Sequence, residues 1–433
     1  MSHTVEILSV GTELLLGSIV NSDAQALSRE LSGLGLNVLY HSVVGDNPGR
    51  LRAAVELARS RADVIVTTGG LGPTCDDLTK QTLAECFGRK LVFHPECARE
   101  IRSFFARMGR EMTDNNLQQA YLPEGCRVLD NAWGTAPGCA FEADGTYVVM
   151  LPGPPAECLP MFRARAMPWL ARLSEGVIRS RTLRVFGLGE SAVEDKLRDR
   201  MNQLQNPTLA PYAKEGEVEL RITAKAETEA EADGLIAPIE AEVRGLFGDL
   251  VYGADVSGLE QVVLDGARAR GLTLGTAESC TGGLIAKRIT DVPGAASVFK
   301  GGVVSYHCEV KAGALGVSQA LLDEKSAVCA EVAGEMARGA RKILGCDLAV
   351  AVTGVAGPDP DERGNPVGLV YTALAAPDGL WVKRLNLSGP RARRDRIRNL
   401  AANHALDMAR RWLAGLAPDS ERAKEAEGGG AGN

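Results

Sequence analysis

The stretch ADVIVTTGGLGPTCDDLTK, residues 62–80, runs from an apolar segment into a glycine-rich turn and a pair of acids. Its first half reads as a buried strand. The glycines at 69, 70 and 72 allow the backbone to approach a ligand closely, as a turn that holds phosphate must. Asp76 and Asp77 follow with the hard oxygen ligands that a divalent ion such as Mg²⁺ prefers. The stretch therefore predicts a strand that ends in a site for phosphate and metal.

Strand-like and helix-like segments alternate before this turn. They cover residues 5–11, 22–35, 36–45 and 48–61. Apolar strands separated by amphipathic helices are typical of a parallel sheet with helices on both faces. Such sheets bind ligands at the carboxyl ends of their strands. The unusual loops stand there, at residues 11–23, 45–50 and 67–80. We expect residues 1–172 to form one α/β domain with its site at that edge.

The length and composition of the chain indicate how many domains it has and which class of protein it is. A chain of 433 residues implies roughly two or three domains. With 45% hydrophobic and 24% charged residues, and no apolar run long enough for a bilayer, the chain reads as a soluble cytoplasmic protein with no membrane partner. The net charge of −7 argues against general attraction to nucleic acid and leaves a local basic patch open. Ten scattered cysteines without a C-x-x-C pair favour reduced thiols over a metal centre.

Two further blocks follow. Residues 177–253 alternate short strands and helices, which predicts a small, KH-like α+β domain. Its turn Gly187–Glu190 is similar to the glycine loop of KH domains, but the acidic flanks Glu190 and Glu194 favour a plain strand-to-helix turn over an RNA clamp. Residues 257–415 again read as α/β. Residues 416–433 are polar and rich in glycine, so we expect a disordered tail.

The third block contains AESCTGG, residues 277–283, where a serine and a cysteine stand side by side before two glycines. A serine needs a base, either His307 or a lysine whose pKa is lowered by burial, such as Lys311. If residues 305–307 form a strand, Tyr306 and His307 point to opposite faces. The turn at Thr281, Gly282 and Gly283 offers backbone N–H groups to an oxyanion. Two alternatives stay open, in which Cys280 is the nucleophile or Ser279 only caps a helix.

The first block resembles the molybdopterin-binding fold, through GGLGPTCDDLT, VGDN, GTAPG and LPGPP, and most closely the N-terminal domain of the CinA (competence/damage-inducible) family. The resemblance implies a three-layer domain that cleaves ADP-ribose to AMP and ribose 5-phosphate with Mg²⁺, Co²⁺ or Mn²⁺. It assigns Asp46 and Asp77 to the metal, with Asp77 also catalytic. The residues that it assigns to the substrate are Glu13, Asn21, Gly69, Gly70, Gly72, Thr79 and Lys80. The alternative is a binding module without turnover.

The third block resembles the C-terminal domain of the same family, the nicotinamide mononucleotide amidohydrolases, through AESCTGG, VVSYHCEVKAGALGV and VTGVAGPDP. The resemblance implies hydrolysis of the carboxamide to nicotinate mononucleotide and ammonia, without a metal or other cofactor. It implies that Ser279 attacks, that Lys311 is the base and that Tyr306 assists. The substrate-binding residues that it implies are Thr281, Gly282, Gly283, Thr353, Gly354 and either Arg391 or Arg394, at the phosphate.

Together these assignments predict a bifunctional hydrolase of pyridine-nucleotide salvage that acts on nicotinamide mononucleotide and ADP-ribose. The alternative is a competence or DNA-damage accessory protein that binds nucleotides without turnover. A homodimer is expected from the resemblance. Nucleic acid and recombination or competence proteins stay open as further partners.

Overall fold

The computed structural model describes residues 3–173, 176–389 and 392–418. By its internal contacts the chain divides into two compact units. One comprises Met1–Arg179 with Thr223–Ile236, and the other comprises Ser180–Ile222 with Ala237–Asn433. Each is described by itself below.

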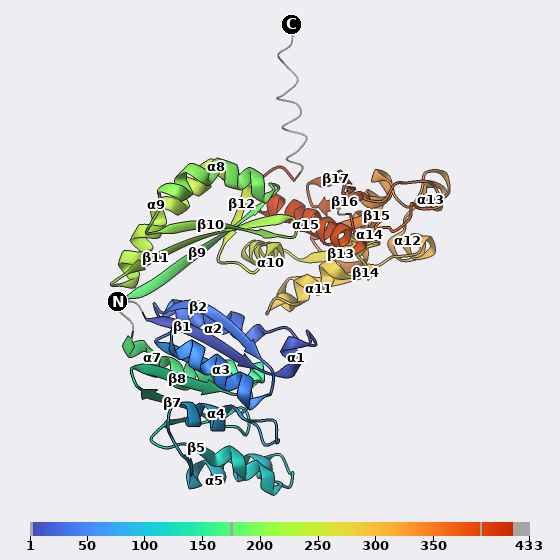
Figure 1. Ribbon diagram of the computed structural model, residues 1–433. Coiled ribbons are helices and arrows are strands. Elements are labelled where there is room, and N and C mark those ends of the chain that lie inside the picture. The colour runs from blue at the N-terminus through green and yellow to red at the C-terminus, as the bar shows by residue number, and fades with distance from the viewer. Residues whose placement is uncertain (1–2, 174–175, 390–391, 419–433) are drawn as a thin grey trace. The chain divides into compact units, whose positions relative to one another are not determined.

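The N-terminal sheet has six strands in the order β2-β1-β3-β8-β7-β6 (Figure 1). The strands are β1 (Thr4–Val10), β2 (Asn37–Val44), β3 (Val64–Thr68), β6 (Arg127–Leu129), β7 (Gly138–Ala143) and β8 (Thr146–Leu151). The first four in the sheet order run parallel, while β7 and β6 are antiparallel to their neighbours. The predicted parallel sheet therefore carries an antiparallel edge that the alternation of apolar segments did not indicate.

Helices cover both faces of this sheet, as the sequence predicts. Strand β1 divides its apolar side chains between the two cores, with Val5 and Ile7 in one and Leu8 and Val10 in the other. One core is closed by α2 (Ser22–Gly33), α6 (Pro155–Met161), η2 (Phe162–Ala166), α7 (Met167–Leu170) and η3 (Ala171–Leu173). The other is closed by α3 (Pro48–Arg59), α4 (Thr79–Cys86), α5 (Pro95–Arg107) and η1 (Asp114–Ala120). The small elements α1 (Thr12–Leu15), β4 (Leu91–Phe93) and β5 (Tyr121–Pro123) complete the domain.

The turns after β1, β3 and β8 lie at one edge of this sheet because the three strands are parallel neighbours. Side-chain caps fix the starts of α2 and α3, which follow β1 and β2: Asn21 accepts from Ala24 N at 3.1 Å, and Asn47 accepts from Arg50 N at 3.0 Å. The sheet thus brings the predicted loops together at the carboxyl ends of the strands.

The middle domain is a four-stranded sheet in the order β10-β11-β9-β12, with two helices. Its elements are β9 (Val177–Phe186), α8 (Glu190–Gln203), β10 (Thr208–Lys214), β11 (Glu217–Ala226), α9 (Glu229–Phe247), η4 (Gly248–Leu250) and β12 (Val251–Ala254). The turn Gly187–Gly189 joins β9 to α8, as expected of a strand-to-helix connection.

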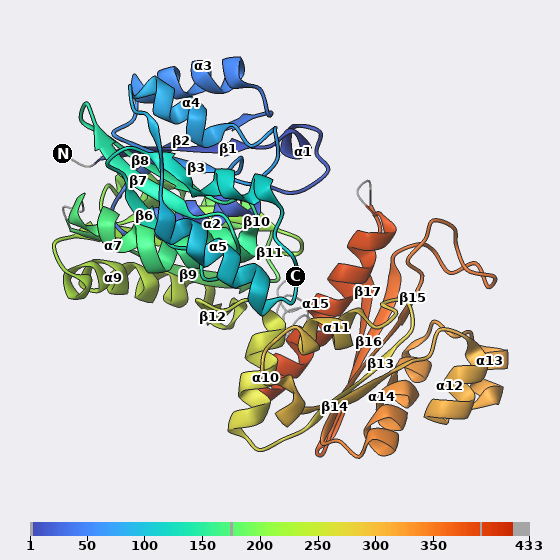
Figure 2. The same cartoon turned by 90° about the horizontal axis from the view of Figure 1, so that it is seen from below.

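The C-terminal domain has a five-stranded sheet in the order β14-β13-β15-β16-β17. Its strands are β13 (Leu274–Glu278), β14 (Phe299–Val304), β15 (Leu348–Gly354), β16 (Leu369–Ala376) and β17 (Gly379–Asn386). The first three in the sheet order are parallel. The helices on one face are α10 (Leu259–Ala269), α11 (Leu284–Thr290) and α15 (Arg394–Leu413), and those on the other are α12 (Cys308–Leu315), α13 (Gln319–Glu324) and α14 (Ala330–Leu344) (Figure 2). A short η5 (Ala295–Ser297) precedes β14.

Two expectations are corrected here. Strand β14 ends at Val304 and α12 begins at Cys308, so Ser305–His307 form a strand-to-helix turn and not a strand. At the other end of the domain, the predicted tail starts too early. Leu416 N donates to Arg411 O at 2.8 Å, and Arg411 Nε donates to Ala417 O at 2.8 Å, which fastens these residues to α15. Residues 419–433 lie outside the described residues.

Within the described residues, no helix combines the length and apolar character needed to cross a bilayer.

A close helix contact gives a stability prediction. A Cβ on Gly339 of α14 would lie 1.9 Å from the carbonyl oxygen of Leu315, whereas a Cβ on Gly313 of α12 would meet nothing within 4 Å. We expect Gly339→Ala to destabilise the C-terminal domain by about 1–3 kcal/mol, because the backbones must separate. Gly313→Ala should be neutral or stabilising by up to about 1 kcal/mol. Thermal unfolding of both variants tests this, and equal midpoints would contradict the close packing.

Candidate active sites

Ser279 directly follows the central parallel strand β13 in a tight turn. Its N–H donates to Val352 O of the neighbouring strand at 2.9 Å, and its carbonyl accepts from Gly282 N at 3.0 Å. Gly282 and Gly283 have φ values of 58° and 91°, which L side chains rarely adopt. The two glycines therefore permit the turn. Because the Gly282 N–H closes it, that group is not available to an oxyanion, contrary to the sequence prediction.

Lys311 reaches Ser279 from the first turns of α12. Its Nζ lies 2.9 Å from Ser279 Oγ, and it donates to Ser305 O at 2.6 Å and to Tyr306 O at 3.2 Å. The side chain is 1% exposed, and burial lowers the pKa of the amine. A neutral amine has two N–H groups and one lone pair, which match two carbonyl acceptors and one hydroxyl. The arrangement therefore suits a lysine that takes a proton from serine.

The alternatives for nucleophile and base are less suitable. Cys280 is buried, and desolvation raises the pKa of its thiol to about 11, so little thiolate forms near neutral pH. His307 is exposed at the start of α12, with its Nδ1 3.8 Å from a carboxylate oxygen of Glu309. Of the two candidate bases, the one in contact with Ser279 is Lys311.

Tyr306 lies beside this pair but presents its backbone to it. Its carbonyl accepts from Lys311, while its hydroxyl accepts from Arg394 Nη2 at 2.9 Å and the ring is 61% exposed. Arg394 also donates to Gly357 O. The phenol therefore pairs with Arg394 at an exposed position, and among the described residues its hydroxyl makes no hydrogen bond to Lys311. Arg391 lies outside the described residues.

Thr353 and Gly354 end strand β15, directly after Val352, whose carbonyl accepts from Ser279 N. Thr353 Oγ1 donates to Ala327 O at 2.7 Å, so its proton is already used. A Cβ on Gly354 would lie 2.7 Å from a methyl group of Val370, which explains a glycine there. Thr281 is fully buried, and its Oγ1 has no hydrogen-bond partner among the described residues.

Two charged residues that support the turn were missed from the sequence. Glu278 is fully buried and accepts from Ile285 N at 3.0 Å and Ala286 N at 2.8 Å, which holds the start of α11. Arg398 donates to Cys280 O at 3.0 Å and Thr281 O at 2.7 Å. Glu278 had a signal, as an acid at the end of an apolar strand. Arg398 had none, since five arginines stand close together in this segment.

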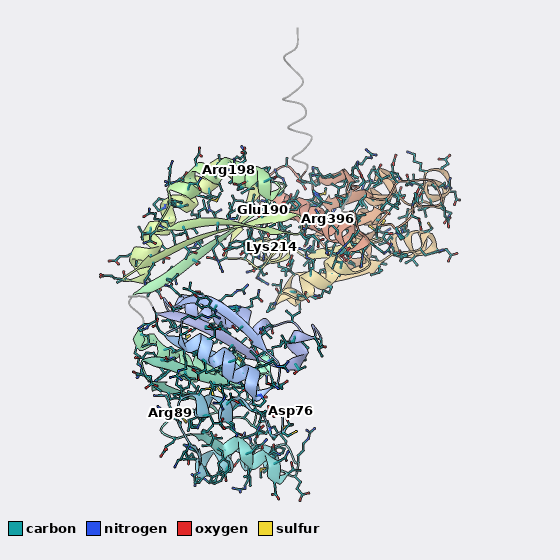
Figure 3. The ribbon with its side chains drawn as sticks, viewed as in Figure 1. Asp76, Arg89, Glu190, Arg198, Lys214 and Arg396 are labelled. Carbon is teal, nitrogen blue, oxygen red and sulfur yellow. The ribbon has the colours of Figure 1, made fainter. Side chains whose placement is uncertain are left out.

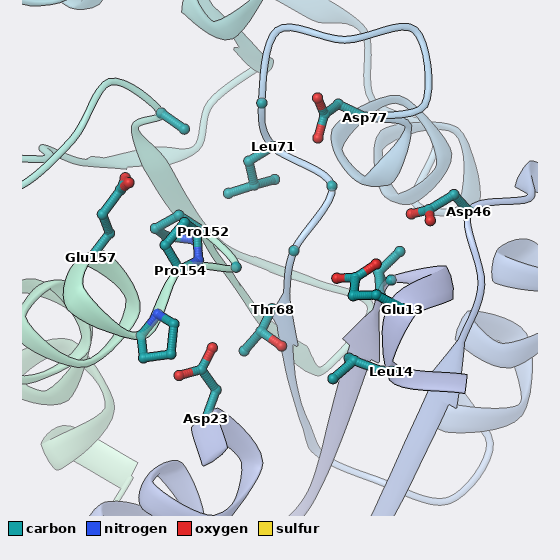
Figure 4. Close-up of a pocket in the computed structure, with 18 of the residues that line it drawn as sticks. Glu13, Leu14, Asp23, Asp46, Thr68, Leu71, Asp77, Pro152, Pro154 and Glu157 are labelled. Atoms are coloured by element: carbon teal, nitrogen blue, oxygen red, sulfur yellow. The ribbon is translucent and has the colours of Figure 1, made fainter. Parts of the chain in front are cut away.

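The second site is a cavity of about 590 Å³ at the carboxyl edge of the N-terminal sheet (Figure 4). The predicted residues that line it are Glu13, Asn21, Asp46, Gly69, Gly70, Gly72 and Asp77. Gly69 and Gly70 have φ values of 92° and 67°. A Cβ would lie 2.2 Å from Val10 O in the first case and 2.1 Å from Thr79 Oγ1 in the second. Glycine is therefore required by both backbone angle and space.

Each of the two predicted metal ligands accepts hydrogen bonds from a threonine through one carboxylate oxygen. Its other oxygen has no hydrogen-bond donor among the described residues. Asp46 Oδ2 accepts from Thr12 N at 2.9 Å and Thr12 Oγ1 at 2.8 Å. Asp77 Oδ2 accepts from Thr74 N at 2.8 Å and Thr74 Oγ1 at 2.6 Å. The carboxylate oxygens of Asp46, Asp77 and Glu13 do not all lie within 4.8 Å of one another. Among the described residues, three ligand atoms come this close at His94, Glu96 and Cys97, which lie outside this pocket. The donors fit Mg²⁺ bound through one or two carboxylates plus phosphate oxygens and water.

Thr79 and Lys80 were predicted to bind substrate, but they are not among the described residues that line this cavity. Lys80 is 5% exposed and donates to Gln118 O at 3.1 Å and Gln119 O at 3.0 Å. Desolvation lowers its pKa to about 8. Both residues begin α4, whose first turn is buried against the core. Asp23 and Glu157, in contrast, line the cavity and were not predicted.

Another cavity, of about 530 Å³, lies beside the turn from β9 to α8. Glu190, Lys214 and Arg396 are near it (Figure 3). In the sequence, the acidic residues Glu190 and Glu194 beside this turn argue against a nucleic-acid clamp. The fold adds two basic side chains from distant segments, together with the acid Glu217, so the local charge is mixed.

These features define a protein with a molybdopterin-binding type of α/β domain and a second α/β domain that carries a buried serine–lysine pair. Residues 6–172 match the family described as probable molybdopterin binding domain, residues 180–253 the damage-inducible protein CinA KH domain, and residues 256–413 the CinA C-terminal domain. The KH match confirms the KH-like fold expected of the middle domain.

The chain is similar along almost its whole length to curated proteins. It is 48% identical over 411 residues to a CinA-like protein of Dictyoglomus turgidum, covering 95% of this chain and 99% of the relative. It is 49% identical over 411 residues to a putative competence-damage inducible protein of Acetivibrio thermocellus, with the same coverage. A crystal structure of CinA with unknown function from Thermoplasma acidophilum is 32% identical, covers 39% of this chain and 98% of that one, and has a TM-score of 0.36. The chain belongs to the CinA family.

Proposed function

We propose that the C-terminal domain hydrolyses the carboxamide of nicotinamide mononucleotide to nicotinate mononucleotide and ammonia. The observation that carries this proposal is the 2.9 Å contact between Lys311 Nζ and Ser279 Oγ, in a setting where burial lowers the lysine pKa. A serine that merely caps a helix has no need of a buried amine held by two carbonyls.

The chemistry follows from this geometry. Lys311 takes the proton of Ser279 as Oγ attacks the amide carbon, and it then gives that proton to the departing nitrogen, which leaves as ammonia. Water hydrolyses the resulting ester and restores the serine. The backbone N–H groups of Thr281 and Gly283 are the candidates for the oxyanion, because Gly282 N is used in the turn.

Arg394 is proposed to bind the nucleotide phosphate. It is exposed and is fixed by Gly357 and by Tyr306, whose carbonyl contacts Lys311, so its remaining N–H groups are held in place to meet an anion. Tyr306 is then a positioning residue for Arg394 and part of the rim, and the proton transfer is left to Lys311.

A second activity is proposed for the N-terminal cavity: cleavage of ADP-ribose to AMP and ribose 5-phosphate. The glycine turn offers a close approach to a pyrophosphate, and Asp46 and Asp77 would hold the divalent ion. The ion would neutralise charge on the phosphates. A water molecule would attack one phosphorus and displace the other phosphate with its sugar, and the free oxygen of Asp46 or Asp77 would accept a hydrogen bond from that water and orient it.

The rival function is a nucleotide-binding accessory protein in competence or DNA damage, the subject of the relatives' names. Incubation of the purified protein with each substrate, with ammonia and AMP measured separately, decides between them. Release of neither product, with binding retained, would favour the rival.

The serine–lysine pair gives the first activity prediction. Because the two residues act as a unit, Ser279→Ala, Lys311→Ala and the double variant should each lose about 10²-fold or more in kcat, to a similar degree. Cys280→Ala is the control and should keep most of the rate. In the wild type, kcat should rise with pH through a lysine pKa below its usual value of about 10.4, because the neutral amine is the base. A dead Cys280→Ala beside an active Ser279→Ala would contradict the assignment.

The phosphate assignment is tested through KM. A contact from a charged group contributes about 1.5–3 kcal/mol, so Arg394→Ala should raise the KM for nicotinamide mononucleotide by at least about 10-fold. Arg391→Ala is the matched control and should change it little. The reverse pattern would move the phosphate to Arg391.

The metal assignment predicts that the two activities separate. Asp77→Asn should abolish ADP-ribose cleavage and leave ammonia release unchanged, since the residue lies in the N-terminal cavity. Chelation by EDTA should do the same in the wild type. Full ADP-ribose cleavage by Asp77→Asn would show that Asp77 neither holds the ion nor orients the water.

A further inference from the structure

Asp23 is a buried acid on the wall of the N-terminal cavity that the proposed chemistry does not use. It is 6% exposed, and its Oδ1 has no hydrogen-bond partner among the described residues. Figure 4 shows its carboxyl directed toward the cavity from the start of α2. The cap of this helix is made by Asn21, so Asp23 is not needed for it.

An acid in this position costs stability. Burial raises the pKa of Asp23 to about 6, and no basic group opposes the shift. The titratable neighbour that interacts with it electrostatically is Cys158 of α6, whose own thiol pKa is raised by burial and which stays neutral. Asp23 is therefore largely ionised near pH 7.5 with an unsatisfied oxygen. Buried polar groups in folded proteins usually have partners, so this one points to a partner supplied by a ligand.

The rest of the cavity limits what that partner is. Neither lysine nor arginine occurs among the described residues that line it, and the phosphate-compatible features are the glycine turn and the acids Asp46 and Asp77. An ionised carboxylate only accepts hydrogen bonds and repels phosphate. No aromatic side chain lines the cavity in the described chain either, so a stacked base is not favoured there. A sugar hydroxyl supplies the donors without an anionic charge.

We infer that Asp23 binds hydroxyl groups of a ribose unit of the ligand, and so selects a sugar-linked pyrophosphate over a bare one. The inference rests on the proposed ADP-ribose activity and adds a specificity-determining residue to it. The two oxygens of one carboxylate can accept from two neighbouring hydroxyls, whereas an amide of the same shape has a single, uncharged oxygen acceptor and makes weaker hydrogen bonds.

The test compares Asp23→Asn with Asp114→Asn, an exposed acid in the same domain. For Asp23→Asn we expect the KM for ADP-ribose to rise at least about 10-fold, with kcat changed by less than about 3-fold and the inhibition constant of inorganic pyrophosphate unchanged. Asp114→Asn should match the wild type throughout.

The thermal midpoint at pH 8 supplies a readout independent of turnover. A raised aspartate pKa means that stability is lost as pH rises through about 6, so Asp23→Asn should melt higher than the wild type at pH 8.

The possible outcomes distinguish a failure of this inference from a failure of the proposed ADP-ribose activity on which it rests. An unchanged KM in Asp23→Asn, or equal weakening of ADP-ribose and pyrophosphate, overturns the inference alone. A wild-type protein that neither cleaves ADP-ribose nor is stabilised by it overturns the proposed N-terminal function and the ligand assigned here. If ADP-ribose binds without turnover, its effect on the melting midpoint carries the comparison, and retention of the full effect in Asp23→Asn contradicts the inference. Should Asp23→Asn not fold, Asp23→Ser replaces it.

Discussion

The burial of one lysine amine against a serine hydroxyl is the constraint that the C-terminal domain is arranged around. An ammonium group taken out of water must find acceptors or lose its proton, and Lys311 has two backbone carbonyls and Ser279 Oγ. The carbonyls come from the turn after β14 and the hydroxyl from the turn after β13. Since β13 and β14 are parallel neighbours, both turns leave the sheet at the same edge, and α12 brings the amine to them.

The two proposed sites use the same scaffold with opposite electrostatics. Each lies where parallel strands end and glycines at positive φ allow the backbone to turn sharply. The N-terminal cavity is lined by carboxylates without a basic side chain among its described residues, so an anionic ligand requires a cation there. In the C-terminal site the acid Glu278 is committed to the start of α11, and the other charged groups near the serine are the basic residues Lys311, Arg394 and Arg398.

Some site residues were predictable because their chemistry and spacing agree. Ser279 and Lys311 stand beside glycines in separate segments and meet as expected. Lys80 shows why the others were not. It follows a glycine turn and two acids, where a phosphate ligand would be placed, but it begins α4 and its side chain is directed to the carbonyls of Gln118 and Gln119. Tyr306 was expected to assist Lys311, but residues 305–307 are a turn and its hydroxyl accepts from Arg394.

The sequence by itself determined the alternation of strands and helices, the glycines that need positive φ, and the residue types on which the proposed serine–lysine chemistry depends. Those properties are local, since they depend on apolar periodicity and on which backbone angles a side chain allows. The tertiary structure decided which side chains face a cavity. Arg398 supports the turn at Ser279 because α15 packs beside it, and α2 packs on the sheet so that Oδ1 of Asp23 is buried with no partner among the described residues. Direction and burial depend on packing between segments far apart in the chain, which no local pattern specifies.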